Sequence, residues 1–149
     1  MKTKTQKTFL DKGFGFPVRL HNVQMVQVRG VWTPNINYHD LARAVLLALS
    51  RKASRLTGRE VRFIRTHFEM TLQAFARRFC VSHVAVLKWE RAGDKPTMTG
   101  WTTEKDLRLF VLSRLGASAK DLARLYKDLE IQPSAKLALI QLNAHDVAA

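Results

Sequence analysis

The chain has 149 residues, a net charge of +13, 46% hydrophobic residues and 25% charged residues. This composition is typical of a folded domain and excludes a disordered, collagen-like or low-complexity chain. The length excludes a large multidomain enzyme, and the single cysteine, Cys80, excludes an intrachain disulfide and multi-cysteine zinc sites. The longest apolar run, residues 44–49, is too short to span a bilayer, and residues 1–10 lack the apolar stretch of a signal peptide. We therefore expect a cytoplasmic protein that does not bind membranes.

The N-terminal third is predicted to contain a β-hairpin preceded by an arm. Residues 1–15 hold four lysines and two glycines without a hydrophobic period, so they are predicted to form a flexible basic arm. The β-branched residues within 16–32 predict two strands that turn near Asn22. Because two strands alone are marginal in water, a helix over residues 37–52 is expected to cover them and to complete a unit at 16–55.

Short amphipathic helices are predicted for the remainder of the chain. Thr57 and Glu60 have the spacing of a capping box, and the Gly and Pro residues within 93–96 interrupt helix formation. Gly116 is placed as a helix stop, and a last helix is predicted from Pro133. The expected N-cap residues are Asn37, Thr57, Thr71, Ser82, Thr103 and Ser118. We expect a mainly α fold, a helix-turn-helix bundle of about five helices with a small N-terminal β-hairpin plus helix.

Basic charge is concentrated before residue 92. Residues 51–91 hold ten Lys or Arg against three acids, whereas residues 92–149 hold eight against seven. A basic region raises the electrostatic potential toward polyanions, and nucleic acid is the commonest partner of this kind. A surface that only keeps the protein soluble is the alternative, because charge alone carries no geometry.

Residues 57–91 have the pattern of a helix-turn-helix. This motif needs a small residue where its two helices touch and apolar residues that face inward from both. Ala76 is the small residue, and a turn containing Cys80 separates the helices. The inward-facing residues are Phe75, Phe79, Val86 and Trp89. An ordinary helical hairpin in a bundle is the alternative, but the caps and the local charge favour DNA binding.

The sequence resembles the Cro/C1-type (Xre) helix-turn-helix regulators over residues 56–116. The resemblance is carried by LTGREVR at residues 56–62, by Phe75-Ala76, by Val81-Ser82 and by Trp89-Glu90. It implies an ion pair between Arg65 and Glu90. It also implies base-reading residues at His83, Val84 and Lys88. Residues near DNA phosphates are expected at Thr71, Leu72, Arg77, Arg78, Arg91 and Lys95.

Three positions depart from the family pattern. Cys80 replaces a glycine that is left-handed in the family, so the turn either carries strain of about 1 kcal/mol or has different backbone angles. Leu72 replaces a glutamine, which removes one side-chain contact to a phosphate. Val84 replaces a polar reader and can contact only a thymine methyl group, so specificity is expected to depend on Lys88 and His83.

The N-terminal half has a narrower resemblance. A β-rich unit that contains VRLHNV at residues 18–23, followed by a helix and a helix-turn-helix, resembles the MqsA (YgiT-type) antitoxins without their zinc cysteines. This resemblance implies a repressor of its own promoter that pairs with a cognate toxin. The alternative is a protein-binding antitoxin or adaptor in which residues 16–52 neutralise a partner and DNA binding is secondary.

No pattern in the sequence predicts an enzyme, a metal site or a cofactor. The histidines lack the i, i+3 or i, i+4 spacing of metal ligands on one helix face: His21, His39, His67, His83 and His145. Cys80 is expected to be a buried small residue, with redox sensing as a weaker hypothesis. Stacking of RNA bases on the tryptophans is an alternative to their packing in the core.

The C-terminal region 117–149 is predicted to form helices that mediate dimerisation. The apolar residues between 107 and 140 exceed what a helix-turn-helix core of this size needs, and they include Leu107, Phe110, Leu125 and Ile140. A symmetric homodimer would place two helices in successive major grooves about 34 Å apart on a palindromic operator.

Overall fold

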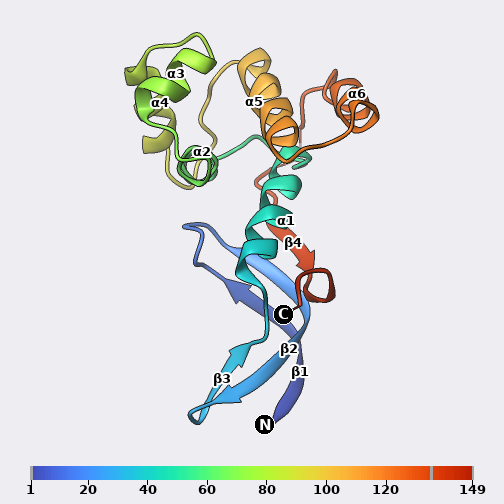
Figure 1. Cartoon of the computed structure of the whole chain (residues 1–149). Coiled ribbons are helices and arrows are strands. Elements are labelled where there is room, and N and C mark those ends of the chain that lie inside the picture. The colour runs from blue at the N-terminus through green and yellow to red at the C-terminus, as the bar shows by residue number, and fades with distance from the viewer. Residues whose placement is uncertain (1, 135, 149) are drawn as a thin grey trace. The chain divides into compact units, whose positions relative to one another are not determined.

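A computed structural model describes residues 2–134 and 136–148, and the chain divides into two compact units. The first contains Met1–Val45 with Leu139–Ala149, and the second contains Leu46–Ala138. Helix α1 (Tyr38–Ser50) begins in the first unit and ends in the second (Figure 1). In the part of the chain that the structure describes, no helix combines the length and the apolar character needed to cross a bilayer.

The first unit is built on a four-stranded mixed sheet. Strand β2 (Val18–Val28) lies at its centre and pairs antiparallel with β1 (Thr3–Asp11) and with β3 (Val31–Pro34). Strand β4 (Ile140–Asn143) pairs parallel with β2 through Val18↔Ile140 to His21↔Asn143. A 3₁₀ helix (Ala144–Val147) follows β4. The C-terminal segment therefore completes a sheet that begins near the N-terminus.

Strand β2 changes its buried face at Asn22. Val18 and Leu20 are buried before this residue, and Val23 and Met25 are buried after it, so the period-2 alternation shifts by one position. Asn22 adopts the left-handed conformation with φ 58°. The prediction of a hairpin turn near Asn22 is therefore wrong, because the strand continues through this residue. The chain reverses instead between β1 and β2 and at Arg29-Gly30, where both φ angles are positive.

The prediction of a mainly α fold is also wrong, because the chain is a mixture of helices and a sheet. The predicted basic arm contains β1, which shows no alternation because eight of its nine residues are not buried. The last helix predicted from Pro133 is not formed by the described residues there, and residue 135 lies outside them. Ile140, one of the apolar residues assigned to the predicted dimer region, is instead buried in β4. The described residues of region 117–149 therefore form one α-helix, a strand and a 3₁₀ helix, rather than the predicted set of helices.

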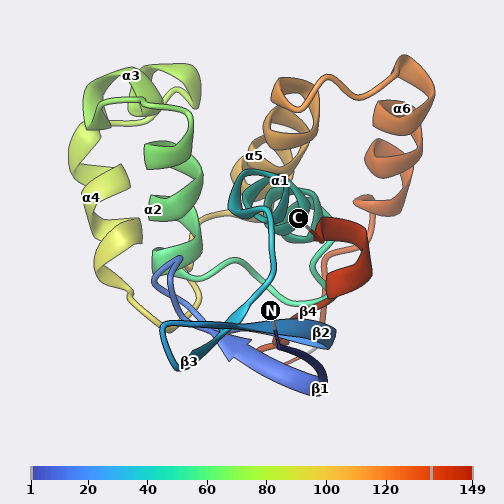
Figure 2. The ribbon, with the colours of Figure 1, turned by 60° about the horizontal axis from the view of Figure 1, so that its bottom comes forward.

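The second unit is helical. Its helices are α2 (Gly58–His67), α3 (Leu72–Arg78), α4 (His83–Arg91), α5 (Trp101–Arg114) and α6 (Ala119–Asp128), in addition to the end of α1. Figure 2 shows α2, α3 and α4 lying together. The predicted caps at Thr57, Thr71, Ser82 and Ser118 are confirmed, since each side chain accepts a hydrogen bond from the first turn of its helix. Helix α5 begins at Trp101 rather than after Thr103.

A buried network of charges holds the segment between α1 and α2. The Arg108 guanidinium, which is almost fully buried, donates to the carbonyl oxygens of Lys52 and Ser54 at 2.6 Å each and to Glu104 Oε2. Glu104 Oε1 accepts from the side chain of Arg55 and from the Leu56 N–H. Burial lowers the pKa of Arg108, and the neighbouring Glu104 carboxylate opposes this shift.

A second buried pair fixes the first turn of α2. Lys52 Nζ contacts both carboxylate oxygens of Glu60 at 2.7 and 2.9 Å. Glu60 also closes the capping box, because its Oε1 accepts from the Thr57 N–H. The same carboxylate therefore serves a helix cap and a buried ion pair, which fixes the start of α2 against the end of the preceding segment.

Gly58 lets the start of α2 approach the end of α4 at backbone distance. Its N–H donates to the Lys95 carbonyl at 3.2 Å, and the Arg59 N–H donates to the Gly93 carbonyl at 3.0 Å. A Cβ atom at residue 58 would lie 2.5 Å from the Trp89 carbonyl oxygen and 2.7 Å from the Gly93 nitrogen. Since these are backbone atoms, a side chain here requires the two helices to separate.

We expect Gly58→Ala to lower the free energy of unfolding by about 1–3 kcal/mol, because the added methyl group collides with the backbone of α4. Gly100→Ala is the matched control, since a Cβ atom there meets no atom within 4 Å and its effect should stay below about 1 kcal/mol. Urea denaturation followed by circular dichroism measures both values. Equal effects of the two substitutions would contradict the close approach.

Candidate nucleic-acid interface

Helices α3 and α4 are joined by a tight turn, residues 79–82. The Val81 N–H donates to the Ala76 carbonyl at 3.0 Å and the Cys80 N–H donates to the Arg77 carbonyl at 3.3 Å. These two hydrogen bonds are those of a Schellman motif, in which the residue after the C-cap is left-handed. Cys80 occupies that position with φ 57°. Of the two alternatives for this turn, the structure therefore has the one with a strained non-glycine residue.

Cys80 is exposed, which corrects the expectation that it is a buried small residue. The Schellman geometry explains this exposure, because the left-handed residue directs its side chain away from the helix end that it terminates.

The interior of the α3–α4 pair contains the residues that the sequence pattern placed there. Phe75, Ala76, Val86 and Trp89 are all buried. The rings of Phe75 and Phe79 lie 4.8 Å apart between centroids. Phe79 in turn meets Phe110 of α5 edge to face at 5.4 Å, which ties the pair to the rest of the helical unit.

The end of α4 is fixed to α2 by a bidentate ion pair. Arg65 donates from Nε to Glu90 Oε2 at 2.7 Å and from Nη2 to Glu90 Oε1 at 2.9 Å, and from Nη1 to the Met70 carbonyl at 2.9 Å. The two side chains are only 15% and 8% exposed. One guanidinium therefore holds the last turn of α4 and the chain after α2 at the same time.

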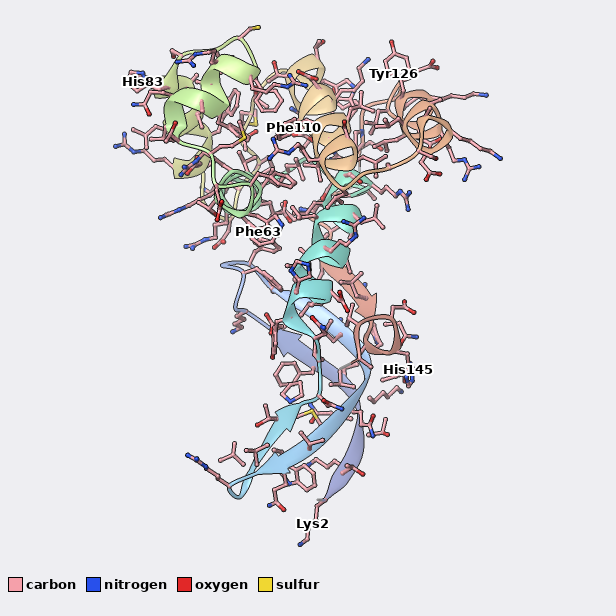
Figure 3. The ribbon with its side chains drawn as sticks, viewed as in Figure 1. Lys2, Phe63, His83, Phe110, Tyr126 and His145 are labelled. Carbon is pink, nitrogen blue, oxygen red and sulfur yellow. The ribbon has the colours of Figure 1, made fainter. Side chains whose placement is uncertain are left out.

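The residues predicted to read bases lie on the outer side of α4. His83, Val84 and Lys88 are all exposed, and the Val84 side chain has 59% of its surface accessible although it is apolar. Figure 3 shows His83 at the outer side of the helical unit. The spacing of four residues places Val84 and Lys88 on the same helical face. His83 precedes Val84 and points about 100° away from it around the helix axis. The first two turns of α4 therefore present one imidazole, one aliphatic side chain and one ammonium group.

The residues predicted near phosphates differ in their exposure and in their partners. Arg77, Arg91 and Lys95 are exposed and, among the residues that the structure describes, form no ion pair with a carboxylate. Arg78 instead donates to both carboxylate oxygens of Asp106 on α5, at 3.0 and 3.3 Å. Its guanidinium is thereby directed toward α5.

The two remaining residues of this group lie at the start of α3. Thr71 serves as the N-cap, with its Oγ1 accepting from the Ala74 N–H at 3.0 Å, and Leu72 is half-buried. The Thr71 hydroxyl is therefore engaged in capping α3, and the Leu72 side chain is only partly accessible.

Several structurally important residues were missed by the sequence reasoning. Gly58 and the buried Glu104–Arg108 pair are visible in the sequence, the first as a glycine directly after an N-cap and the second as an i, i+4 pair of opposite charge. Asp106 could not be found as the partner of Arg78, since 28 residues separate them.

The described residues include no group of His, Cys, Asp and Glu side chains that could bind a metal ion.

Comparison of the chain with protein-family models, with curated proteins and with solved structures finds no match in any of the three. The resemblances to the Xre regulators and to the MqsA antitoxins therefore remain predictions from the sequence.

We expect Glu90→Ala to lower the free energy of unfolding by about 3 kcal/mol, since it leaves the largely buried Arg65 guanidinium without its carboxylate. Asp94→Ala is the control, because the Arg59–Asp94 pair is 53% and 80% exposed and such pairs contribute below about 1 kcal/mol. Denaturant unfolding measures both. Similar losses in the two variants would show that the Arg65–Glu90 pair does not hold α4.

Proposed function

We propose that the protein is a sequence-specific DNA-binding transcriptional regulator that represses its target. The observation that supports this most is the outer surface of α4, where His83, Val84 and Lys88 are exposed while Val86 and Trp89 fix the helix from its inner side. The exposed aliphatic side chain of Val84 suits contact with a thymine methyl group.

In this proposal α4 enters the major groove with its first two turns. Lys88 donates to guanine O6 and N7, Val84 contacts a thymine methyl group, and His83 supplies a further hydrogen bond to a base edge. Arg77, Arg91 and Lys95 contact phosphates around the groove, since they are exposed cations without carboxylate partners among the described residues. Arg78 is removed from this set because Asp106 binds it. Each phosphate contact adds to the salt dependence of binding.

We propose that the protein binds a palindromic operator as a homodimer. The apolar surplus that predicted a dimer interface is largely used inside the chain, where Leu107, Phe110 and Leu125 are buried in the helical unit and Ile140 in the sheet. Two copies of α4 on an inverted repeat are instead suggested by the small number of base contacts that one copy offers.

We expect Lys88→Ala to weaken binding to the preferred duplex by about 1–3 kcal/mol and to relax specificity at one base pair. Lys120→Ala removes the same charge from an exposed position on α6 and should change affinity little and equally for all sequences. Selection of duplexes from genomic fragments, followed by titration at several salt concentrations, provides the measurement. Loss of the same size on every sequence would contradict base reading by Lys88, and the absence of any salt-sensitive binding would contradict the function itself.

We expect two protein copies on a duplex that carries an inverted repeat, with half-site centres about 34 Å apart or a multiple of that distance. Size-exclusion chromatography with light scattering, run with and without the selected duplex, gives the stoichiometry. A single copy at micromolar concentration in both runs would exclude the homodimer while leaving DNA binding by α4 intact.

A further inference from the structure

The helical unit contains a groove that the proposed DNA contact does not use. It has a volume of about 580 Å³ and lies between α5 and α6, with Arg78 of α3 at one side. This volume is in the range of small-molecule sites, and the groove is largely open to solvent. Its lining is mostly apolar and includes Leu109, Phe110 and Leu122. Figure 3 shows Phe110 on α5 and Tyr126 on α6, the two helices that border the groove.

Two guanidinium groups are held at this groove by aromatic rings. Arg78 Cζ lies 5.2 Å and Arg114 Cζ 5.5 Å from the centroid of the Phe110 ring. Arg114 also lies over Phe68 at 5.0 Å, and Arg78 over Phe79 at 4.9 Å. A guanidinium stacked on a ring keeps its N–H donors in its own plane, where they stay available for a carboxylate.

The charges at the groove are not balanced. Asp106 pairs with Arg78, whereas Arg114 forms no ion pair with a carboxylate in residues 2–134 and 136–148. Two cations and one carboxylate leave a net charge of +1 among the lining residues. The groove is therefore complementary to a ligand that carries one negative charge and an apolar body.

We propose that this groove binds a small organic carboxylate with an aromatic or branched apolar body. The carboxylate accepts hydrogen bonds from Arg114, and the apolar body lies between Leu109 and Leu122, with the exposed ring of Tyr126 beside it. The arrangement favours a carboxylate over a DNA phosphate, because the apolar lining would be left empty by a phosphate on a duplex.

The proposal is tested with 3-phenylpropionate as the probe, using the full chain without DNA so that the result does not depend on the proposed function. Two-dimensional NMR titration should show saturable shifts at residues around Phe110 and Tyr126, with a dissociation constant on the order of millimolar. The neutral amide of the same acid should bind about tenfold more weakly, since it lacks the charge that Arg114 recognises. Absence of saturable shifts with the acid would overturn the proposal.

Two variants separate the groove from a general attraction of anions to a basic protein. Arg114→Met keeps an unbranched side chain of similar length against Phe68 and Phe110 and should weaken binding of the acid about tenfold. Ser113→Leu fills the exposed wall of the groove without altering either guanidinium and should also weaken it. Arg124→Met, on α6 outside the groove lining, is the matched control and should bind the acid as the wild type does.

The affinities of the variants for the acid show whether it binds in the groove. Equal affinity in Arg114→Met, Ser113→Leu and the wild type would overturn the proposal, since the acid would then bind elsewhere. Groove shifts that depend on protein concentration rather than on the acid would also overturn it, because they would identify the occupant as a second copy of the chain. Thermal unfolding of each variant confirms that it is folded.

Discussion

The bidentate pair between Arg65 and Glu90 is the interaction on which the candidate interface depends. It joins the last turn of α2 to the last turn of α4, and Gly58 joins the first turn of α2 to the same end of α4 by backbone contact. Helix α4 is therefore fixed at its C-terminal end through two independent contacts, while the outer side of its first two turns, with His83, Val84 and Lys88, remains exposed. A helix held in this way can present side chains to a ligand with little loss of conformational freedom, because its own orientation is already determined.

The buried charged side chains fix the first turn of α2 and the segment that precedes it. Lys52, Arg55 and Arg108 bind two buried carboxylates and three backbone carbonyls, and the described residues include no buried side-chain N or O atom without a hydrogen-bond partner. Replacing such a network with apolar residues would cost little stability, whereas removing one member would leave a buried charge unpaired. The network instead restricts conformation. Its directional hydrogen bonds favour a single backbone conformation of the segment between α1 and α2, whereas apolar contacts would be compatible with several conformations.

Sequence reasoning predicted the helical unit better than the sheet, for a physical reason. The helix boundaries depend on local interactions, so Thr57, Thr71, Ser82 and Ser118 could be identified as caps from their immediate neighbours. The sheet depends on pairing between distant segments. The exposed strand β1 carries no hydrophobic alternation of its own, and the alternation of β4 covers only its four residues, Ile140–Asn143. Asn22 is a residue type that favours turns, and it does adopt a left-handed backbone conformation. The chain does not reverse there, however, and only the set of buried residues along β2 shifts by one position. At the candidate interface, the exposed residues of α4 followed from helical period, but the binding of Arg78 by Asp106 required the tertiary structure.

The distribution of charge explains why net charge alone overstates the number of available cations. Half of the ten basic residues between 51 and 91 have carboxylate partners in the structure: Lys52, Arg55, Arg59, Arg65 and Arg78. Three of those partners, Asp94, Glu104 and Asp106, come from the nearly neutral part of the sequence that follows. Folding therefore moves acids toward the basic region and leaves a smaller set of unpaired cations, of which Arg77, Lys88 and Arg91 lie on α3 and α4. Since phosphate contacts require exposed cations in one place rather than a high total, it is this smaller set, and not the net charge, that supports the proposed contact of α4 with a nucleic acid.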